Sequence, residues 1–521
     1  MYALNKSSNT INSISKVAYA ELIGKDKKSV FKQKIRLQYN EYSYGDFTIP
    51  SNLVTGHYKL IVYTQWMRNA GSANFSQNDI YIVNPFLDYT NPKNGTQHKD
   101  ENINAQITSP LLKMELNKLR FSKREKVVLQ VKKSIDGVLS GNYSISVRKK
   151  SELFSPKRNS ITAFVSPTQS ENNVIKFVEA QNSYSVYAPE HKGELITGMV
   201  LDKNKTPAAD VKVALSVPGE SFIFSTTKTN KLGVFYFDIE SSYTSNNAII
   251  QVTNEKKEDF SIVVYEPAMF NYEQLKFNDL FVSVAQLESI KQRIVASQIE
   301  NAFSSVKQDE ITLTKPTARF YKADYVYKLD DFKRFSTISE TMVEVVEHSW
   351  ITKRRGKHTF HIRDYKSNKS ELLPLILIDG LLVQNHEELY NYPSAQVKII
   401  NIITDRFLYR NETYGGVINV ETVDKNYQLT SRGDYIKYLP LVQPLEKKEY
   451  HQPNYNRDVD KLKRIPDYRL QLYWNPSINF TNKEEQIEFY TSDITGDFEI
   501  YIEGFTNQGK PVSIKEIIQV R

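Results

Sequence analysis

The stretch of sequence that most constrains the fold is residues 374–420. It begins with Leu375–Ile378, an unbroken apolar run that is typical of a strand buried on both faces. Asp379-Gly380 follows at once and is a strong turn signal. A carboxylate at the end of such a strand can be catalytic, but no second carboxylate or base is visibly paired with Asp379. We therefore interpret Asp379 as capping the turn that it forms with Gly380.

The remainder of this stretch changes between helical and extended patterns. His386 to Tyr392 predicts one or two helical turns, which Pro393 ends. Val397–Ile402 is rich in β-branched residues and predicts a second strand, and Tyr414–Val420 alternates into a third. The order strand, short helix, strand, glycine turn, strand indicates a small mixed α/β unit.

The same stretch resembles the plug domain of TonB-dependent outer-membrane receptors. That domain has a P-L-x-x-I-D-G-V strand, an I-x-x-I-x-V strand and a Y-G-x-x-x-G-V-I-x-I ending. The matching residues are Pro374, Ile378, Asp379, Gly380, Ile399, Ile402, Tyr414, Gly415, Gly416, Val417 and Ile418. The resemblance implies a plug-like α/β domain over residues 336–424, and a capping box that starts at Thr337 predicts the helix that opens it.

In those receptors the plug lies inside a β-barrel encoded by the same chain. A barrel of about 22 strands, with about ten residues in each, needs roughly 220 residues for its strands. Only 97 residues follow Asp424, because the chain has 521 residues. We therefore expect the plug-like unit either to stand free or to meet a barrel that another protein supplies.

A glycine-led pattern recurs along the rest of the chain: glycine, any residue, an aromatic residue, any residue, then an aliphatic or aromatic residue. It starts at Gly45, Gly56, Gly141, Gly233 and Gly496. Each instance predicts a turn that leads into a strand whose alternate residues face a core. The spacing is too irregular for a solenoid. The sequence therefore predicts a mainly β, multidomain chain in which tandem β-sandwiches, macroglobulin-like and transthyretin-like, carry a small α/β plug-like domain.

Residues 1–86 form the first predicted sandwich, with strands expected at Val17–Leu22, Val30–Leu37 and Tyr58–Tyr63. The segments SKVAYAEL, GDFTIP, TGHYKLIVYTQWMRN and IYIVNPF resemble a macroglobulin-type MG2 domain of bacterial envelope proteins. In that family further strands precede the first one here, which implies a domain that is incomplete at its N-terminus. After an Asn- and Pro-rich linker, residues 109–190 resemble a second sandwich of the same type.

Residues 193–265 contain the segments ITGMV, VKV, TKT and GVFYF, which resemble the carboxypeptidase regulatory-like fold. This small transthyretin-like sandwich has no peptidase chemistry and commonly precedes TonB-type plugs. Residues 467–521, with YRLQLYWNP and IEFYTSD, resemble the closing sandwich of the same envelope family. Between them, residues 283–304 repeat apolar side chains at intervals of three and four, which predicts an amphipathic helix within a helical connector at 283–335.

Composition excludes several classes of site. The chain has no cysteine, so it has no disulfide, no thiolate metal site and no thioester of the kind with which macroglobulins proper trap proteases. No apolar run is long enough for a membrane-spanning helix. The N-terminus lacks the apolar region of a signal peptide, which alone indicates the cytosol, whereas the envelope resemblances imply the periplasm or association with the outer membrane.

Two segments contain histidines that deserve comparison with metal sites. The segment HEEL at 386–389 begins like a zincin helix, but Tyr390 stands where the second histidine would be. His358 and His361 lie three apart in a predicted strand, so we expect them to point to opposite faces. We expect no metal and no cofactor, because two ligands are too few for a zinc site.

The densest basic cluster is Lys353–His358, centred on Gly356. It could meet an acidic partner or anionic headgroups. We favour the plainer interpretation, a solvated hairpin turn, because short runs of charge are usually solvated loops.

These observations predict a non-enzymatic cell-envelope protein. By resemblance, its role is to bind or plug an outer-membrane β-barrel transporter or translocon made by another chain, and we expect no nucleic-acid partner. A plug without its own barrel should keep a polar face, since barrel lumens are polar. The candidate partner-binding residues are Arg406, Arg410, Asn411 and Glu412. The alternative is a periplasmic or surface binding module for a glycan or a peptide, in which these residues form an ordinary solvated loop.

Overall fold

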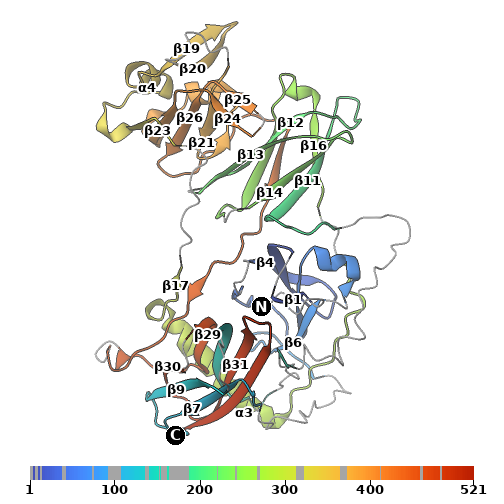
Figure 1. The fold of residues 1–521 in the computed structure, drawn as a ribbon, viewed down its shortest axis with the longest axis vertical. Coiled ribbons are helices and arrows are strands. Elements are labelled where there is room, and N and C mark those ends of the chain that lie inside the picture. Colours follow the sequence, from blue (N-terminus) through green and yellow to red (C-terminus); the bar gives the residue numbers. More distant parts are fainter. Residues whose placement is uncertain are drawn as a thin grey trace. The chain divides into compact units, whose positions relative to one another are not determined.

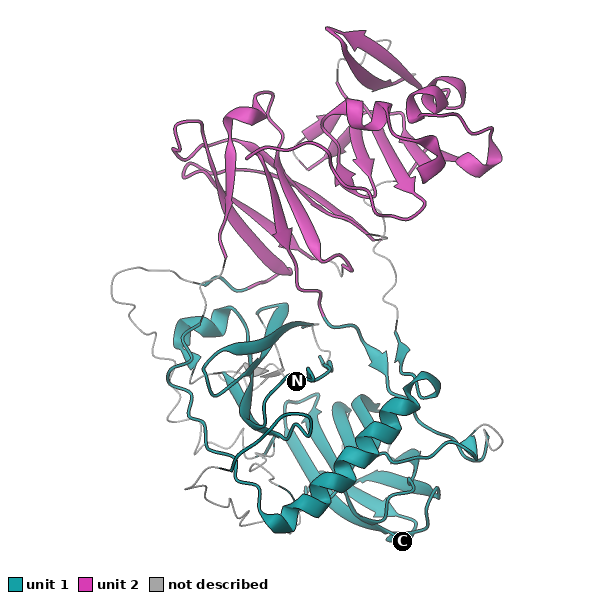
Figure 2. Ribbon diagram, turned by 180° about the vertical axis from the view of Figure 1, so that it is seen from behind, with its two compact units in different colours: residues 1–189, 270–313, 445–521 teal, residues 190–269, 314–444 magenta. Residues whose placement is uncertain are grey.

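The structure is a computed structural model that describes residues 4–5, 10–11, 14–37, 43–72, 75–91, 107–134, 140–151, 153, 161–162, 187–219, 221–240, 243–266, 270–312, 322–363, 372–410, 412–457, 462–481 and 484–521. Its elements are mainly strands in many separate sheets, which confirms the prediction of a mainly β chain (Figure 1). The chain divides into two compact units, each assembled from separate segments (Figure 2). Unit 1 holds residues 1–189, 270–313 and 445–521, and unit 2 holds residues 190–269 and 314–444.

The first part of unit 1 is an antiparallel sheet in the order β4-β3-β5-β6. Its strands are β3 (Val17–Ile23), β4 (Ser29–Arg36), β5 (Gly56–Tyr63) and β6 (Ser76–Ile82), and before them β1 (Leu4–Asn5) pairs with β2 (Thr10–Ile11). The three strands predicted for residues 1–86 correspond to β3, β4 and β5. Tyr272 and Leu275 pack into the same core as Ile61 and Tyr63, so a segment far downstream completes this core.

The second part of unit 1 is a sandwich built from two distant stretches of sequence. One sheet has the order β29-β10-β31-β32-β8 and the other the order β30-β9-β7. The strands are β7 (Leu112–Leu116), β8 (Arg120–Phe121), β9 (Lys126–Lys133), β10 (Gly141–Lys149), β29 (Gln471–Phe480), β30 (Glu484–Tyr490), β31 (Gly496–Thr506) and β32 (Pro511–Val520).

This arrangement corrects the expectation of one sandwich at 109–190 and a separate one at 467–521. Strand β10 lies between β29 and β31, and β9 pairs with β30. Buried residues of both stretches, such as Val147 and Ile500, belong to one hydrophobic core. Sheets must cover one another to bury their apolar faces, and here each stretch supplies strands to both layers.

The amphipathic helix predicted at 283–304 is α3 (Val284–Ala302) in unit 1. Ser283 and Gln286 form its capping box, and Ile290 is buried in a small core with Leu280 and Val282. A short ladder of β17 (Glu310–Ile311) with β28 (Lys448–Glu449) follows the helix.

The first part of unit 2 is a sandwich of the sheets β14-β11-β16 and β13-β12-β15-β27. The strands are β11 (Glu194–Leu201), β12 (Lys212–Val217), β13 (Ile223–Lys228), β14 (Val234–Ile239), β15 (Asn247–Val252), β16 (Ser261–Val264) and β27 (Ile436–Pro440). Strand β27 lies beyond residue 424 in the sequence and pairs with β15. The sandwich expected from residues 193–265 therefore takes one strand from outside those bounds.

The second part of unit 2 is built on a mixed sheet in the order β18-β23-β26-β21-β22. The strands are β18 (Tyr325–Lys328), β21 (Leu375–Ile378), β22 (Leu381–Leu382), β23 (Val397–Ile403) and β26 (Val417–Thr422). All four residues of β21 are buried, as its unbroken apolar run predicts. Strand β18 pairs with β23, so the segment expected to be a connector at 283–335 gives its last strand to this sheet.

Two short helices and two hairpins accompany this sheet. They are α4 (Ile338–Glu344), α5 (His386–Tyr390), the hairpin of β19 (Ser349–Arg354) with β20 (Lys357–Ile362), and the hairpin of β24 (Phe407–Tyr409) with β25 (Glu412–Tyr414). The Thr337 side chain accepts a hydrogen bond from the backbone N–H of Glu340 and caps α4, as predicted.

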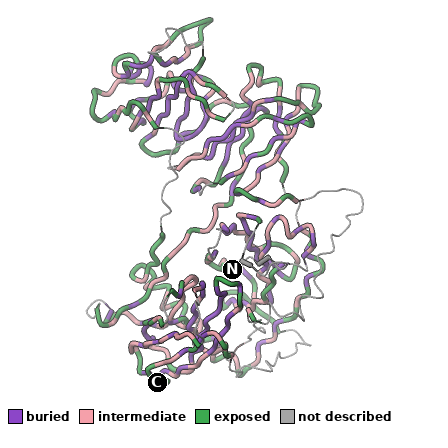
Figure 3. Tube along the Cα trace, in the orientation of Figure 1, coloured by how far each residue is buried: buried purple, intermediate pink, exposed green. Residues whose placement is uncertain are grey.

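The two parts of unit 2 share one hydrophobic core, to which the sandwich contributes residues such as Leu215 and the α/β part residues such as Leu381. Figure 3 shows buried segments in both parts. Polar contacts to the backbone of Leu382 in β22 add to this packing: its N–H donates to Ser216 Oγ at 3.2 Å, and Gln251 Nε2 donates to its carbonyl at 2.9 Å. The edge strand β22 of the α/β sheet is therefore hydrogen-bonded to the sandwich.

Candidate functional site

The candidate partner-binding residues lie on and beside the β24–β25 hairpin. Arg406 and Arg410 are exposed, and neither forms an ion pair with a described residue. Arg410 has a φ of 54°, which places its backbone in the left-handed region at the hairpin turn. Asn411 lies outside the described residues. Glu412 is half-buried, and Lys212 Nζ donates a hydrogen bond to its Oε2 at 2.6 Å.

The rest of this hairpin packs against the sandwich of unit 2. The hydroxyl of Tyr409 donates to the carbonyl of Phe224 at 2.5 Å, and the two rings stack with centroids 5.6 Å apart. Phe407 packs against a small hydrophobic core that contains Phe224 and Leu375. The two arginines are exposed to solvent, whereas Glu412 forms an internal ion pair, so the three described residues do not form a single free surface.

Asp379 is a buried structural carboxylate. Its Oδ1 accepts a hydrogen bond from the backbone N–H of Thr422 at 2.8 Å, and its Oδ2 accepts from Thr422 Oγ1 at 2.6 Å and from the N–H of Tyr427 at 3.2 Å. The residue has a φ of 50° at the β21–β22 turn. The predicted turn is present, but the predicted capping role is corrected: the carboxylate accepts from residues more than forty positions later and ties the turn to the end of β26.

The HEEL segment forms α5, and its three polar side chains all have partners within unit 2. Nδ1 of His386 accepts from the backbone N–H of Phe360 at 2.9 Å. Glu387 accepts from the backbone N–H of His358 at 2.5 Å. Glu388 accepts from the hydroxyl of Tyr427 and from the N–H of Thr430, each at 2.7 Å. Burial alone would raise the pKa of Glu388, but hydrogen bonds from Ser431, Thr430 and Tyr427 hold it below its usual value.

Lowering the pH is expected to destabilise unit 2 through His386. Burial, followed by repulsion from His361 and Lys257, holds the pKa of His386 at about 4, below its ordinary value of 6.5. Between these two pH values His386 binds a proton in the unfolded chain but not in the folded chain. The free energy of unfolding is therefore highest above about pH 6.5 and decreases as the pH falls toward 4. The expected loss is on the order of 3 kcal/mol.

Urea unfolding at several pH values checks this expectation. The control variant is His386→Asn, whose amide oxygen stands at the position of Nδ1 and can still accept from the N–H of Phe360 but does not titrate. It should show a flatter dependence of unfolding free energy on pH than the parent chain. Equal slopes for the two proteins would contradict the assignment to His386.

An open groove of about 440 Å³ lies in unit 2 between α4 and the β19–β20 hairpin. Val343 and Glu344 of α4 form one side, and Ile351 and Lys353 of β19 form another. The sequence patterns did not predict this groove. The capping box of α4 and the basic hairpin were both visible in the sequence, but their closeness depends on the tertiary structure.

The histidines of the hairpin point to its two faces, as predicted. The ring of His358 stacks on Tyr390, with centroids 3.7 Å apart, beside the groove. His361 stacks on Trp350 on the opposite face at 5.0 Å. The predicted turn centred on Gly356 is also present, because Arg354 pairs with Lys357 across the end of the hairpin.

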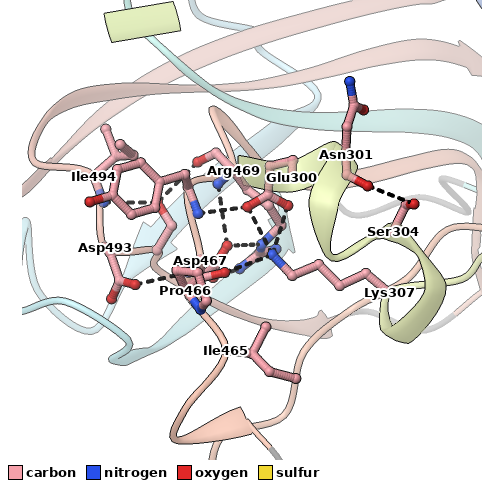
Figure 4. Close-up of polar contacts among 12 residues, drawn as sticks. Glu300, Asn301, Ser304, Lys307, Ile465, Pro466, Asp467, Arg469, Asp493 and Ile494 are labelled. Atoms are coloured by element: carbon pink, nitrogen blue, oxygen red, sulfur yellow. Dashed lines mark hydrogen bonds and ion pairs between the residues drawn. The ribbon is translucent and has the colours of Figure 1, made fainter. Parts of the chain in front are cut away.

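Unit 1 contains a dense polar cluster that joins the end of α3 to the sandwich (Figure 4). Arg469 Nε and Nη2 donate to the two carboxylate oxygens of Asp467, each at 2.8 Å. Glu300 accepts two hydrogen bonds from Lys307, each at 2.8 Å, and one from the N–H of Tyr468 at 2.7 Å. Such a fully paired arrangement is typical of a structural network rather than of a reactive centre.

Within the described part of the chain, no group of three or more His, Asp or Glu side chains is placed to hold a metal ion. None of the helices in the described ranges combines the length and the apolar composition that crossing a membrane requires. The comparisons with known proteins gave no match, either to a protein-family model or to a curated protein.

Proposed function

We propose that this chain is a non-enzymatic protein of the cell envelope that binds or plugs an outer-membrane β-barrel supplied by another chain. The proposal rests on the plug-like sequence of residues 374–420 and on one structural observation. That observation is the pair of exposed arginines, Arg406 and Arg410, beside and on the β24–β25 hairpin, with no ion pair to a described residue.

The chemistry of a barrel lumen suits such a surface. Lumens are lined by polar side chains, so a protein that occupies one needs hydrogen-bond donors and charges rather than an apolar patch. A guanidinium group offers five N–H donors and keeps its charge at any physiological pH. Two arginines near one tight turn would favour a partner surface that is rich in carboxylates.

Reversing these two charges tests the proposal. The variant Arg406→Glu/Arg410→Glu is expected to lose most of the co-purification with a barrel protein from detergent-solubilised outer membranes. Removing a charged contact from an interface typically weakens binding by on the order of tenfold or more. The matched control is Lys203→Glu/Lys231→Glu, which reverses two exposed charges on turns of the sandwich in the same unit.

The proposal requires that the parent chain and the control recover the same barrel protein and that the arginine variant, although folded, does not. Equal recovery by all three would exclude this hairpin as the contact. If the parent chain recovers no barrel protein, the plug interpretation fails, and a periplasmic or surface binding module for a glycan or a peptide takes its place.

A further inference from the structure

The register of the β19–β20 hairpin determines which of its backbone groups face outward. Arg355 and Gly356 form its turn with φ values of 51° and 79°, as a two-residue turn between twisted strands requires. Arg354 and Lys357 are then the backbone hydrogen-bonded pair next to the turn. Moving away from the turn, pairs without backbone hydrogen bonds to each other alternate with hydrogen-bonded pairs. The pairs Lys353–His358 and Ile351–Phe360 therefore direct their backbone N–H and C=O groups away from the hairpin.

One of the two outer edges is closed by α5. The outward N–H of His358 donates to Glu387, and the outward N–H of Phe360 donates to Nδ1 of His386. These two bonds confirm the assignment of outward positions on β20. They also satisfy the donors that an edge strand otherwise leaves unpaired.

The other outer edge, on β19, remains open. Among the described residues, the outward N–H groups of β19 form one backbone hydrogen bond, at the base of the strand, where the N–H of Ser349 donates to the carbonyl of Val346 at 3.3 Å. The backbone N–H groups of Ile351 and Lys353 have no partner among the described residues. A strand edge with two successive free donors is a template for a further strand.

The groove beside α4 adjoins this edge. It is lined by Ile351 and Lys353 and also by His358, the cross-strand partner of Lys353, so it lies over one face of the hairpin. Val343, which is 65% exposed, also lines it, so the groove gives an added strand apolar contacts in addition to the hydrogen bonds of the edge. An added strand lies about 4.8 Å from the edge that it extends, so the side chains that it directs to this face of the hairpin can reach the groove.

The charged residues around this edge indicate which kind of peptide would bind there. Lys353, Arg354, Arg355 and Lys357 are exposed at the tip of the hairpin, and none forms an ion pair with a described residue. Glu340 and Glu344 line the side of the groove formed by α4. We propose that the free edge of β19 binds an extended peptide as an additional strand, with acidic residues at the end nearest the hairpin tip. This surface does not involve Arg406 or Arg410, so the proposal is independent of a barrel partner.

Peptide binding to the full chain tests the proposal. The probes are fluorescein-labelled peptides of about eight residues, a length typical of a strand, in which valine and threonine alternate and two aspartates stand at one end. One probe has the aspartates at its N-terminus and another at its C-terminus, because an added strand can run in either direction. Control peptides carry two lysines in place of the aspartates, or N-methyl groups on alternate backbone nitrogens. Fluorescence polarisation at low and at high salt measures the affinity.

Two substitutions of one residue separate the backbone contact from the charge. Lys353→Pro removes the outward N–H, which the hairpin itself does not use, and a proline is tolerated at such an edge position. Lys353→Gln removes the charge and keeps the N–H. The proline variant should bind the aspartate peptide about tenfold more weakly than the parent, and the glutamine variant only about twofold more weakly. Protection of the Ile351 amide from hydrogen exchange by the peptide reports the same contact without a mutation.

The opposing outcomes are equally specific. Equal losses for the two variants, or equal binding of the N-methylated peptide, would reduce the contact to charge attraction and overturn strand addition. If no aspartate peptide binds the parent chain, the proposal fails. A concentration-dependent dimer that Lys353→Pro abolishes would show that a second copy of the chain occupies the edge, which also overturns it. Circular dichroism of each variant establishes that the fold is intact.

Discussion

Replacing Arg469 by alanine is expected to lower the free energy of unfolding of unit 1 by about 3–5 kcal/mol. Asp467, whose residue is only 2% exposed, accepts two hydrogen bonds from the Arg469 guanidinium. Burial alone would raise the pKa of Asp467, but the hydrogen bonds and charge of Arg469 hold it below its usual value. Removing the arginine leaves a buried carboxylate without its counter-charge and leaves the carbonyl of Leu472 without its donor.

Urea unfolding followed by tryptophan fluorescence measures this effect, since Trp474 lies in β29 of the same sandwich. The control is Lys126→Ala, because Lys126 Nζ lies 2.7 Å from Glu488 and both side chains of this pair are more than a third exposed, at 36% and 43%. Such an exposed pair adds little to the free energy of unfolding. The double variant Asp467→Leu/Arg469→Leu should recover much of the loss, because it removes both charges together. A single Arg469→Ala variant as stable as the control would show that the ion pair is not desolvated.

Replacing Gly380 by alanine is expected to destabilise unit 2 by about 3 kcal/mol. Gly380 has a φ of 84°, and an added Cβ would lie 2.2 Å from Cβ of Phe222. The left-handed conformation alone costs a non-glycine residue about 1–2 kcal/mol. The remainder comes from moving Phe222, which packs where the α/β part meets the sandwich.

Gly356 supplies the matched control for this substitution. Its φ is 79°, and no atom lies within 4 Å of the position that a Cβ would take. The variant Gly356→Ala should therefore lose only the conformational part, about 1 kcal/mol. Thermal unfolding of both variants, and of Gly380→Ala in a Phe222→Gly background that removes the Cβ of residue 222, separates the two contributions. Equal losses at the two glycines would show that the contact with Phe222 has no energetic role.

The sequence alone determined the elements whose signals are local. The unbroken apolar run at 375–378 predicted a strand buried on both faces, and all four residues of β21 are buried. The capping box at Thr337 and the periodicity of 283–304 predicted α4 and α3. The cluster around Gly356 predicted a hairpin turn, because a tight turn needs a residue that adopts positive φ easily. In each case the determining interactions lie within a few residues of each other.

The sequence also identified part of the candidate surface. It singled out Arg406 and Arg410 as polar residues between strands, and both are exposed. It grouped Glu412 with them, although that carboxylate pairs with Lys212, two hundred residues earlier. The sequence shows that a side chain is charged. It does not show whether a charged residue from elsewhere in the chain already forms an ion pair with it.

Only the tertiary structure decided which strands pair across long distances. Strand β10 lies between β29 and β31, and β27 (Ile436–Pro440) completes a sheet whose other strands all lie between Lys212 and Val252. Alternation of apolar and polar residues shows that a strand has one buried face, but every sandwich strand carries the same pattern. The choice among possible neighbours depends on which assembly buries the most apolar surface and leaves the fewest backbone groups unpaired. This balance depends on the whole unit and cannot be read from any single segment. The same long-range packing places α4 beside the β19–β20 hairpin.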